Sequence, residues 1–138
     1  MAYAGDLRPT EAWELLRSEP GAQLIDVRTA AEWSFVGVPD LHVLNKRTAL
    51  ISWQVYPTMQ VNDRFADEVA RLVPETKTPI LFICRSGGRS AAAAAALTAR
   101  GFQRCYNIAG GFEGGHDASG HRGSAGGWKA DGLPWTQE

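Results

Sequence analysis

One apolar run, followed directly by a turn and an alanine-rich segment, limits the possible folds more than any other feature of this sequence. Residues 79–83 are Pro-Ile-Leu-Phe-Ile, which is typical of a strand buried on both faces of a parallel sheet. Residues 89–100 contain six consecutive alanines and predict a helix that ends at Gly101. Because residues 104–108 predict another strand, residues 80–108 indicate one β-α-β unit, whose crossover we expect to be right-handed.

Shorter patterns before this unit continue the alternation of strands and helices. Three β-prone segments have the length of strands: residues 22–27, 42–44 and 49–53. Three other segments predict helices: residues 9–17, 32–35, and 63–73 with Asn62 as the N-cap. The sequence therefore predicts the α/β fold class.

The composition excludes several functional classes. A formal net charge of −1 gives no general attraction to nucleic acid or to an anionic membrane. No apolar run approaches the roughly 20 residues that span a bilayer, and the N-terminal residues lack the pattern of a signal peptide. We therefore expect a cytoplasmic protein. Its two cysteines, Cys84 and Cys105, are too few for a disulfide framework, so at least one thiol is expected to be free.

The segment between the predicted buried strand and the alanine-rich helix has the composition of an anion-binding loop. It consists of Cys84, Arg85, Ser86, Gly87, Gly88, Arg89 and Ser90. Glycines allow several backbone N–H groups to point inward, and the start of the helix adds partial positive charge. The simpler interpretation is an ordinary turn after a buried cysteine. It does not explain two arginines and two adjacent glycines beside that cysteine.

Cys84 is the candidate nucleophile. Cysteines at a helix N-terminus beside arginine commonly ionise near neutral pH, and the thiolate is the reactive form. Arg85 and Arg89 would donate charge-assisted hydrogen bonds to an oxyanion such as thiosulfate, so an anionic substrate is favoured over a neutral one. The predicted substrate-binding residues are those that follow Cys84 in the loop: Arg85, Ser86, Gly87, Gly88, Arg89 and Ser90.

Several motifs together resemble the rhodanese homology domain, and the resemblance extends over nearly the whole chain. They are Leu-Ile-Asp-Val-Arg at residues 24–28, Glu32-Trp33, the loop from Cys84 to Arg89, Gly110-Gly111-Phe112, and the closing Trp128, Gly132, Leu133 and Pro134. The resemblance implies a rhodanese-like fold with a central, mostly parallel five-stranded sheet and helices on both faces. It also implies a single domain over residues 1–138, with a glycine-rich insertion at about residues 114–127.

The resemblance implies a thiosulfate sulfurtransferase that needs no metal or other cofactor. Cys84 would take the outer sulfur of thiosulfate or a related small anionic donor as a persulfide, and a thiophilic acceptor would remove it. The acceptor would be cyanide in the test tube and a thiol or a protein in the cell. Arg85 favours thiosulfate, because relatives that use mercaptopyruvate usually have glycine at that position.

Two alternatives belong to other classes. One is a non-catalytic or persulfide-relay module that binds a protein partner, although inactive members of the family generally lack the cysteine. The other is a cysteine-based phosphatase or arsenate reductase. Related phosphatases have five residues between cysteine and arginine, whereas four separate Cys84 from Arg89. The shorter loop favours sulfur transfer.

Weaker signals concern residues outside the loop. Asp26 and Arg28 form an Asp-x-Arg pair at a strand end, which we interpret as a structural anchor rather than an acid-base pair. His116 and His121 are too weak a pattern to predict a metal site. Cys105 lies in an alternating strand, where a small buried side chain is the expected role rather than a resolving thiol.

Overall fold

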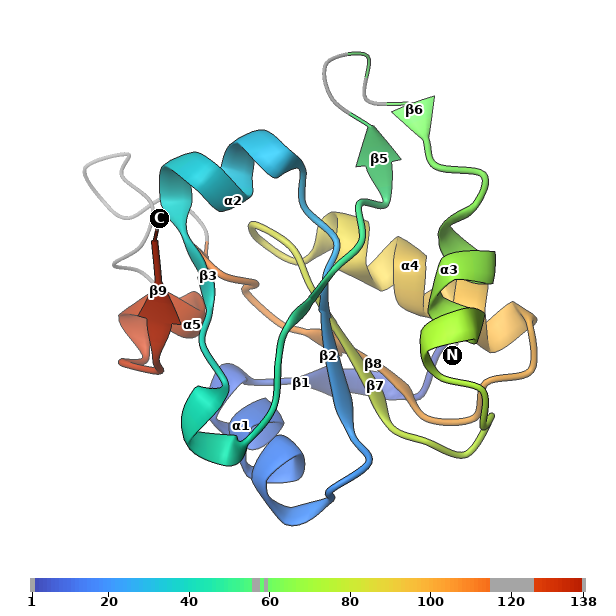
Figure 1. Ribbon diagram of the computed structural model, residues 1–138, viewed down its shortest axis with the longest axis horizontal. Coiled ribbons are helices and arrows are strands. Elements are labelled where there is room, and N and C mark those ends of the chain that lie inside the picture. The colour runs from blue at the N-terminus through green and yellow to red at the C-terminus, as the bar shows by residue number, and fades with distance from the viewer. Residues whose placement is uncertain (1, 56–57, 59, 115–125, 138) are drawn as a thin grey trace.

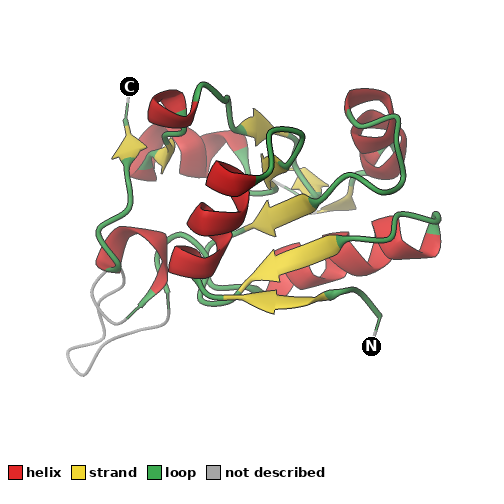
Figure 2. Cartoon of the chain, turned by 90° about the horizontal axis from the view of Figure 1, so that it is seen from below, coloured by secondary structure: helices red, strands yellow, loops and turns green. Residues whose placement is uncertain are grey.

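The computed structural model describes residues 2–55, 58, 60–114 and 126–137. Within these residues the centre is a five-stranded sheet in which every neighbouring pair is parallel (Figures 1 and 2). In spatial order the strands are β1 (Gly5–Leu7), β8 (Cys105–Ile108), β7 (Ile80–Ile83), β2 (Gln23–Asp26) and β4 (Ala49–Leu50). The predicted α/β class and its central sheet are confirmed.

Helices cover both faces of the sheet, as predicted. They are α1 (Pro9–Ser18), α2 (Ala30–Val36), α3 (Phe65–Leu72), α4 (Gly88–Ala99) and α5 (Gly127–Ala130). The helices α3 and α4 pack on one face, and α1 and α5 pack on the other. The helix α2 follows β2, so it begins near the carboxyl edge of the sheet (Figure 1).

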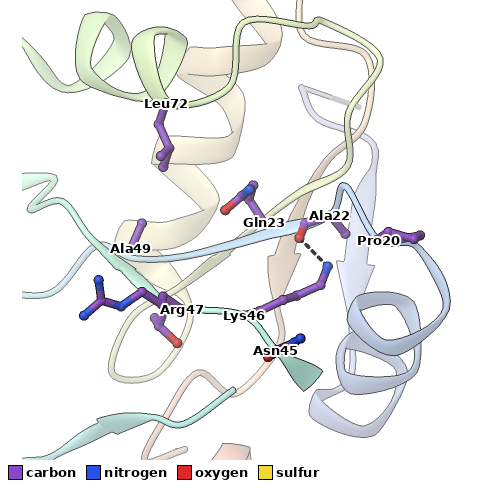
Figure 3. A pocket seen from close by; sticks show the side chains of 9 residues that line it. Pro20, Ala22, Gln23, Asn45, Lys46, Arg47, Ala49 and Leu72 are labelled. Atoms are coloured by element: carbon purple, nitrogen blue, oxygen red, sulfur yellow. Dashed lines mark hydrogen bonds between the residues drawn. The ribbon is translucent and has the colours of Figure 1, made fainter. Parts of the chain in front are cut away.

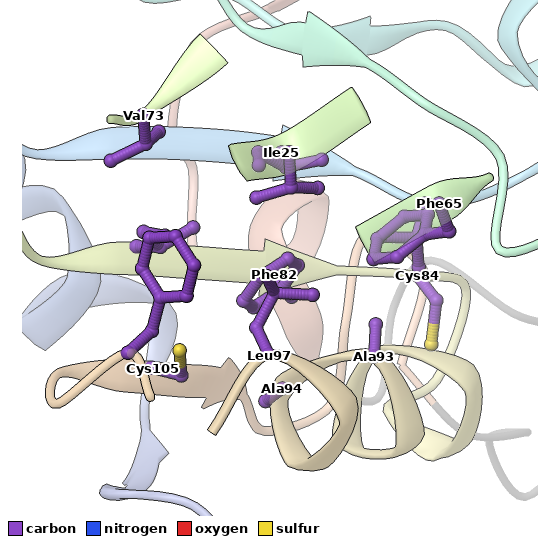
Figure 4. Close-up of a cluster of buried hydrophobic side chains, with 13 residues drawn as sticks. Ile25, Phe65, Val73, Phe82, Cys84, Ala93, Ala94, Leu97 and Cys105 are labelled. Atoms are coloured by element: carbon purple, nitrogen blue, oxygen red, sulfur yellow. The ribbon is translucent and has the colours of Figure 1, made fainter. Parts of the chain in front are cut away.

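The central strands send alternate side chains to opposite faces. Ile25 and Phe82 lie in the cluster with α3 and α4 (Figure 4), whereas Leu24 and Leu81 lie in the cluster with α1 and α5. Because β7 is covered on both sides, all its side chains are buried. This explains why the apolar run at residues 79–83 has no polar interruption.

Short elements complete the described part of the chain. β3 (Val38–Pro39) pairs with β9 (Trp135–Thr136), and β5 (Gln54–Val55) pairs with β6 (Gln60–Val61); both pairs are antiparallel. No helix within the described ranges is both long and apolar enough to cross a membrane.

One predicted strand, at residues 42–44, is wrong. His42–Leu44 forms the 3-10 helix η1 instead. The Asp40 carboxylate accepts a hydrogen bond from the backbone N–H of His42 at 3.0 Å and so stabilises the turn. Asn45, in the left-handed conformation with φ of 62°, ends it. The local hydrogen bond from Asp40 here outweighs the β-propensity of Val43.

Two other predicted elements have different bounds. The strand expected at residues 49–53 is only Ala49–Leu50. The helix expected at residues 63–73 begins at Phe65, because Asn62 caps the preceding turn: its Oδ1 accepts the backbone N–H of Arg64 at 3.1 Å. Asn62 is therefore not the N-cap of α3.

Candidate active site

The segment from Cys84 to Ser90 joins the carboxyl end of β7 to the first turn of α4, as the sequence predicts. Gly87 has φ of 118°, a conformation that side chains rarely allow, and it directly precedes the helix. The loop therefore needs a glycine at position 87 to make its turn. Its first residue, Cys84, follows the central strand of the sheet.

Backbone groups of the residues that follow β8 form hydrogen bonds with the backbone of the loop. The N–H of Phe112 donates to the carbonyl of Cys84 at 2.8 Å, and the N–H of Glu113 donates to the carbonyl of Arg85 at 3.0 Å. Gly111 allows this approach, because a Cβ there would lie 2.5 Å from the Cys84 carbonyl oxygen. The Gly110-Gly111-Phe112 motif thus fixes the backbone of the loop.

The sulfur of Cys84 is buried and lies within hydrogen-bond distance of two donor groups. Cys84 is 1% exposed, and its side chain points toward α4 (Figure 4). The Gly87 N–H lies 3.1 Å from Sγ, and the hydroxyl of Ser90, also buried, lies 3.2 Å from it. Both groups can stabilise negative charge on the sulfur.

Arg89 is placed differently from the other predicted binding residues. Its Nη1 and Nη2 donate to the two carboxylate oxygens of Glu32 at 2.7 and 2.9 Å. Burial acts to raise the pKa of Glu32, but the hydrogen bonds and charge of Arg89 outweigh it and hold that pKa below its usual value. Hydrogen bonding to Glu32 raises the pKa of Arg89. The Arg89 guanidinium is thus engaged with α2, and its binding of a donor anion stays a prediction.

Arg85, Ser86 and Gly88 lie on the exposed side of the loop. Within the described ranges, no side chain forms an ion pair with the Arg85 guanidinium. Arg85 therefore supplies a positive charge that the described part of the protein does not neutralise.

Asp26 and Arg28 form a fully buried ion pair beside the loop. Arg28 Nε and Nη2 donate to the Asp26 carboxylate at 2.9 and 2.6 Å, and Nη2 also donates to the Gly37 carbonyl at 2.6 Å. The Arg28 guanidinium carbon lies 4.4 Å from the centre of the Phe112 ring. The pair therefore links the end of β2 to the end of α2 and to the residues that support the loop.

Cys105 lies at the other end of the same core cluster (Figure 4). It pairs with Ile80 at the start of β7, whereas Cys84 follows the end of that strand. At a rise of about 3.3 Å per residue, the two cysteines are separated by roughly 13 Å, too far for a disulfide. Burial raises the pKa of the Cys105 thiol. Cys105 therefore cannot act as a resolving thiol in this conformation.

Sequence reasoning missed two residues of the site. Glu32 belongs to a sequence motif, but its pairing with Arg89 joins positions 57 residues apart. Asn107 lies within an apolar strand pattern, yet its Oδ1 lies 2.5 Å from Ser90 Oγ. A polar residue in an otherwise buried strand was the available signal.

The predicted insertion at residues 114–127 falls mostly outside the described residues, as do His116 and His121. Within the described ranges, no cluster of three or more histidine, cysteine, aspartate or glutamate side chains could hold a metal ion.

A cavity of about 590 Å³ lies at the opposite edge of the sheet from Cys84, beside the first residues of β2 and β4 (Figure 3). Lys46 stands in it and donates to the carbonyls of Glu19 and Ala22 at 2.9 and 2.6 Å. These contacts tie the segment before β4 to the turn after α1, so we interpret Lys46 as structural.

Comparisons with known proteins support the fold and show the family. The sequence matches the STR4 middle domain family over residues 5–138. The crystal structure of Rv0390 from M. tuberculosis is 47% identical, with a TM-score of 0.87 over 99% of both chains. An uncharacterized protein of Rickettsia conorii is 40% identical over 91% of this chain and 92% of its own length.

Two more distant proteins have names that state an activity or a domain type. The thiosulfate sulfurtransferase GlpE of Actinobacillus pleuropneumoniae is 29% identical over 94% of this chain and 90% of its own length. A rhodanese-like domain protein from Staphylococcus aureus is 18% identical, with a TM-score of 0.57 over 98% of this chain and 99% of the other, a likeness of fold alone. The chain therefore belongs to the STR4 middle domain family and is a rhodanese-like domain protein.

Proposed function

We propose that this protein is a sulfurtransferase that carries a sulfane sulfur as a persulfide on Cys84. The observation that carries the proposal is the setting of the sulfur at the end of β7, between the Gly87 N–H at 3.1 Å and the Ser90 hydroxyl at 3.2 Å. Donors fixed in this way stabilise a thiolate and the charge that develops when it reacts. The relationship to GlpE, named a thiosulfate sulfurtransferase, supports the same chemistry.

Thiosulfate is the donor that the loop favours. Arg85 is exposed and without an ion-pair partner in the described part of the chain, so it can attract and hold an oxyanion at the mouth of the loop. In the first half-reaction the Cys84 thiolate attacks the outer sulfur of thiosulfate. The S–S bond of the donor breaks, sulfite leaves with its electron pair, and Cys84 carries a persulfide with one negative charge.

The second half-reaction regenerates the thiolate. A thiophilic acceptor attacks the outer sulfur, the Cys84 S–S bond breaks, and its electron pair returns to Sγ. With cyanide the product is thiocyanate; in the cell we propose a thiol or a protein thiol as the acceptor. Neither half-reaction uses a metal or another cofactor. Two free cysteines suit the reducing cytoplasm, where we expect the reaction to occur.

The test is the intact mass of the reduced protein before and after thiosulfate, followed by cyanide. We expect wild type and Cys105→Ala to gain one sulfur atom and to release it as thiocyanate. Cys84→Ser should keep its fold and gain nothing. Cys105→Ala is the matched control, because it removes the other thiol of the same core cluster.

Two results would contradict the proposal. A wild-type protein that gains no sulfur would exclude transfer from thiosulfate, and hydrolysis of an aryl phosphate by that protein would point to a phosphatase. Sulfur gain in Cys84→Ser would show that the nucleophile is another residue.

A further inference from the structure

A chain of hydrogen bonds runs from the sulfur of Cys84 to the surface of β1. Ser90 Oγ lies 3.2 Å from Cys84 Sγ and 2.5 Å from Asn107 Oδ1. Asn107 Nδ2 donates to Asp6 Oδ1 at 2.9 Å, and the Tyr3 hydroxyl donates to the same oxygen at 2.9 Å. Ser90 and Asn107 are buried, whereas Asp6 is exposed. The sulfur is thus connected to a carboxylate on the edge strand of the sheet.

Asp6 fixes the orientation of the Asn107 amide. A carboxylate only accepts hydrogen bonds, so the amide must turn its N–H₂ group toward Asp6. Its oxygen then faces Ser90. Asn107 therefore presents an acceptor, not a donor, to the Ser90 hydroxyl.

The Ser90 hydroxyl has one proton and three possible acceptors. Besides Asn107 Oδ1 these are Cys84 Sγ and the Gly87 carbonyl at 3.3 Å, and the contact with Asn107 is the shortest. While the proton points at Asn107, only lone pairs of Ser90 Oγ face the sulfur. That arrangement suits a neutral sulfur, either a thiol or the inner sulfur of a persulfide. A thiolate needs the hydroxyl turned toward it.

We propose that Asn107 is a positioning residue that competes with the Cys84 sulfur for the Ser90 hydroxyl. The hydroxyl donates to Asn107 when Cys84 Sγ is neutral and turns to Sγ when it becomes a thiolate. The inference deepens the proposed function, on which its role in turnover rests. When the acceptor removes the outer sulfur, Cys84 is released as a thiolate. The Ser90 hydroxyl then stops donating its hydrogen bond to Asn107 and donates it to Sγ instead.

Charged and titratable groups near Cys84 come from several elements, and the key variant below replaces none of them, although Asp6 loses its hydrogen bond from Asn107. They are Arg85 and Arg89 of the loop and α4, Asp26 and Arg28 of β2 and its end, Glu32 of α2, and Tyr3 and Asp6 at β1.

The key variant is Asn107→Leu, which keeps the branching of the side chain and removes the competing acceptor. The readout is the rate of alkylation of Cys84 by iodoacetamide as a function of pH, with Cys84 identified by peptide mass. We expect the profile to move to lower pH, with alkylation about two- to tenfold faster below the wild-type midpoint, as expected for one exchanged hydrogen bond. No sulfur donor is present, so the result is independent of whether the protein transfers sulfur.

Ser90→Ala shows whether Asn107 acts through the hydroxyl. We expect Ser90→Ala to move the profile to higher pH, and adding Asn107→Leu to that variant to change nothing further. A wild-type profile in folded Asn107→Leu would overturn the proposal. An equal shift with and without Ser90 would overturn it too, because Asn107 would then act by another route.

Asp6→Asn tests the same chain from its exposed end, where the fold is not at risk. It allows the Asn107 amide to turn its N–H₂ group toward Ser90, so we expect a shift to lower pH that disappears in the Ser90→Ala background. A shift that persists there would be a plain charge effect and would count against the proposal. Asp67→Asn, which removes another exposed carboxylate, is the matched control and should leave the profile unchanged.

Discussion

Arg89 and Glu32 form a two-point ion pair that joins the first turn of α4 to the first turn of α2. The two N···O distances are 2.7 and 2.9 Å, and both side chains are only 19% exposed. Glu32 Oε1 is also 3.3 Å from the backbone N of Thr29, the N-cap of α2. The charge of Arg89 is thus used to hold α2 beside the loop that carries Cys84.

Removing the Glu32 charge should therefore destabilise the protein. We expect Glu32→Gln to lower the free energy of unfolding by about 1 to 3 kcal/mol, the range for a hydrogen-bonded charged group that loses its partner. Urea denaturation measures this. Glu14→Gln is the matched control, because Glu14 pairs with Arg17 on the exposed surface of α1 and should matter little. Equal effects of the two variants would show that the partly buried pair adds no more stability than the exposed one.

The same pair should make stability depend on acid pH. The pKa of Glu32 in the folded protein lies below its ordinary value of 4.5, since Arg89 outweighs the effect of burial. The unfolded chain then binds the proton more readily. The contribution of the pair is full above about pH 4.5 and is lost as the pH falls through the folded pKa. Urea unfolding of wild type and Glu32→Gln over this range should show their difference shrinking toward low pH; a constant difference would contradict the assignment.

Arg85 should act on binding of the donor rather than on the chemical step. We expect Arg85→Ala to raise the KM for thiosulfate roughly two- to tenfold with little change in kcat, as for one charge-assisted contact to the substrate. Steady-state thiocyanate formation at several salt concentrations measures this. The difference in KM between wild type and Arg85→Ala should shrink as the salt concentration rises. Arg47→Ala is the control, because Arg47 lines the cavity at the opposite edge of the sheet. An unchanged KM in Arg85→Ala would remove Arg85 from the binding site.

Gly111 should tolerate no side chain. A Cβ there would lie 2.5 Å from the Cys84 carbonyl oxygen, and φ is 61°. We expect Gly111→Ala to cost about 2 kcal/mol or more and to impair persulfide formation, because the loop must shift. Gly132→Ala is the control that tests the backbone conformation without the steric contact. Gly132 also has a positive φ of 77°, but a Cβ built there would have no atom within 4 Å. Thermal unfolding and the mass assay compare them, and equal losses would contradict the steric argument.

The sequence was most informative around Cys84, because the apolar run, the glycine turn and the alanine-rich helix each have a strong local pattern. It was least informative where long-range pairing decides the structure. β1, Gly5–Leu7, was not predicted: it is three residues long and contains an aspartate, and it is a strand only because it pairs with residues 106–108.

Side-chain partners were harder to predict than elements. The loop sequence suggested that both arginines face the substrate, yet Arg89 contacts a carboxylate brought near by folding. Likewise, the sequence of residues 104–108 does not indicate that Asn107 of β8 contacts Ser90 in the first turn of α4. Such contacts depend on which strand ends meet at one edge of the sheet.

The two thiols lie at opposite ends of one buried strand pairing, and the chain has no third. A sulfur atom carried on Cys84, as proposed above, would therefore have no neighbouring thiol to which it could pass, and the persulfide form could not close as an internal disulfide. On the proposed mechanism, removal of the sulfur would require an acceptor from outside the protein, and the lifetime of the persulfide would be set by the supply of that acceptor.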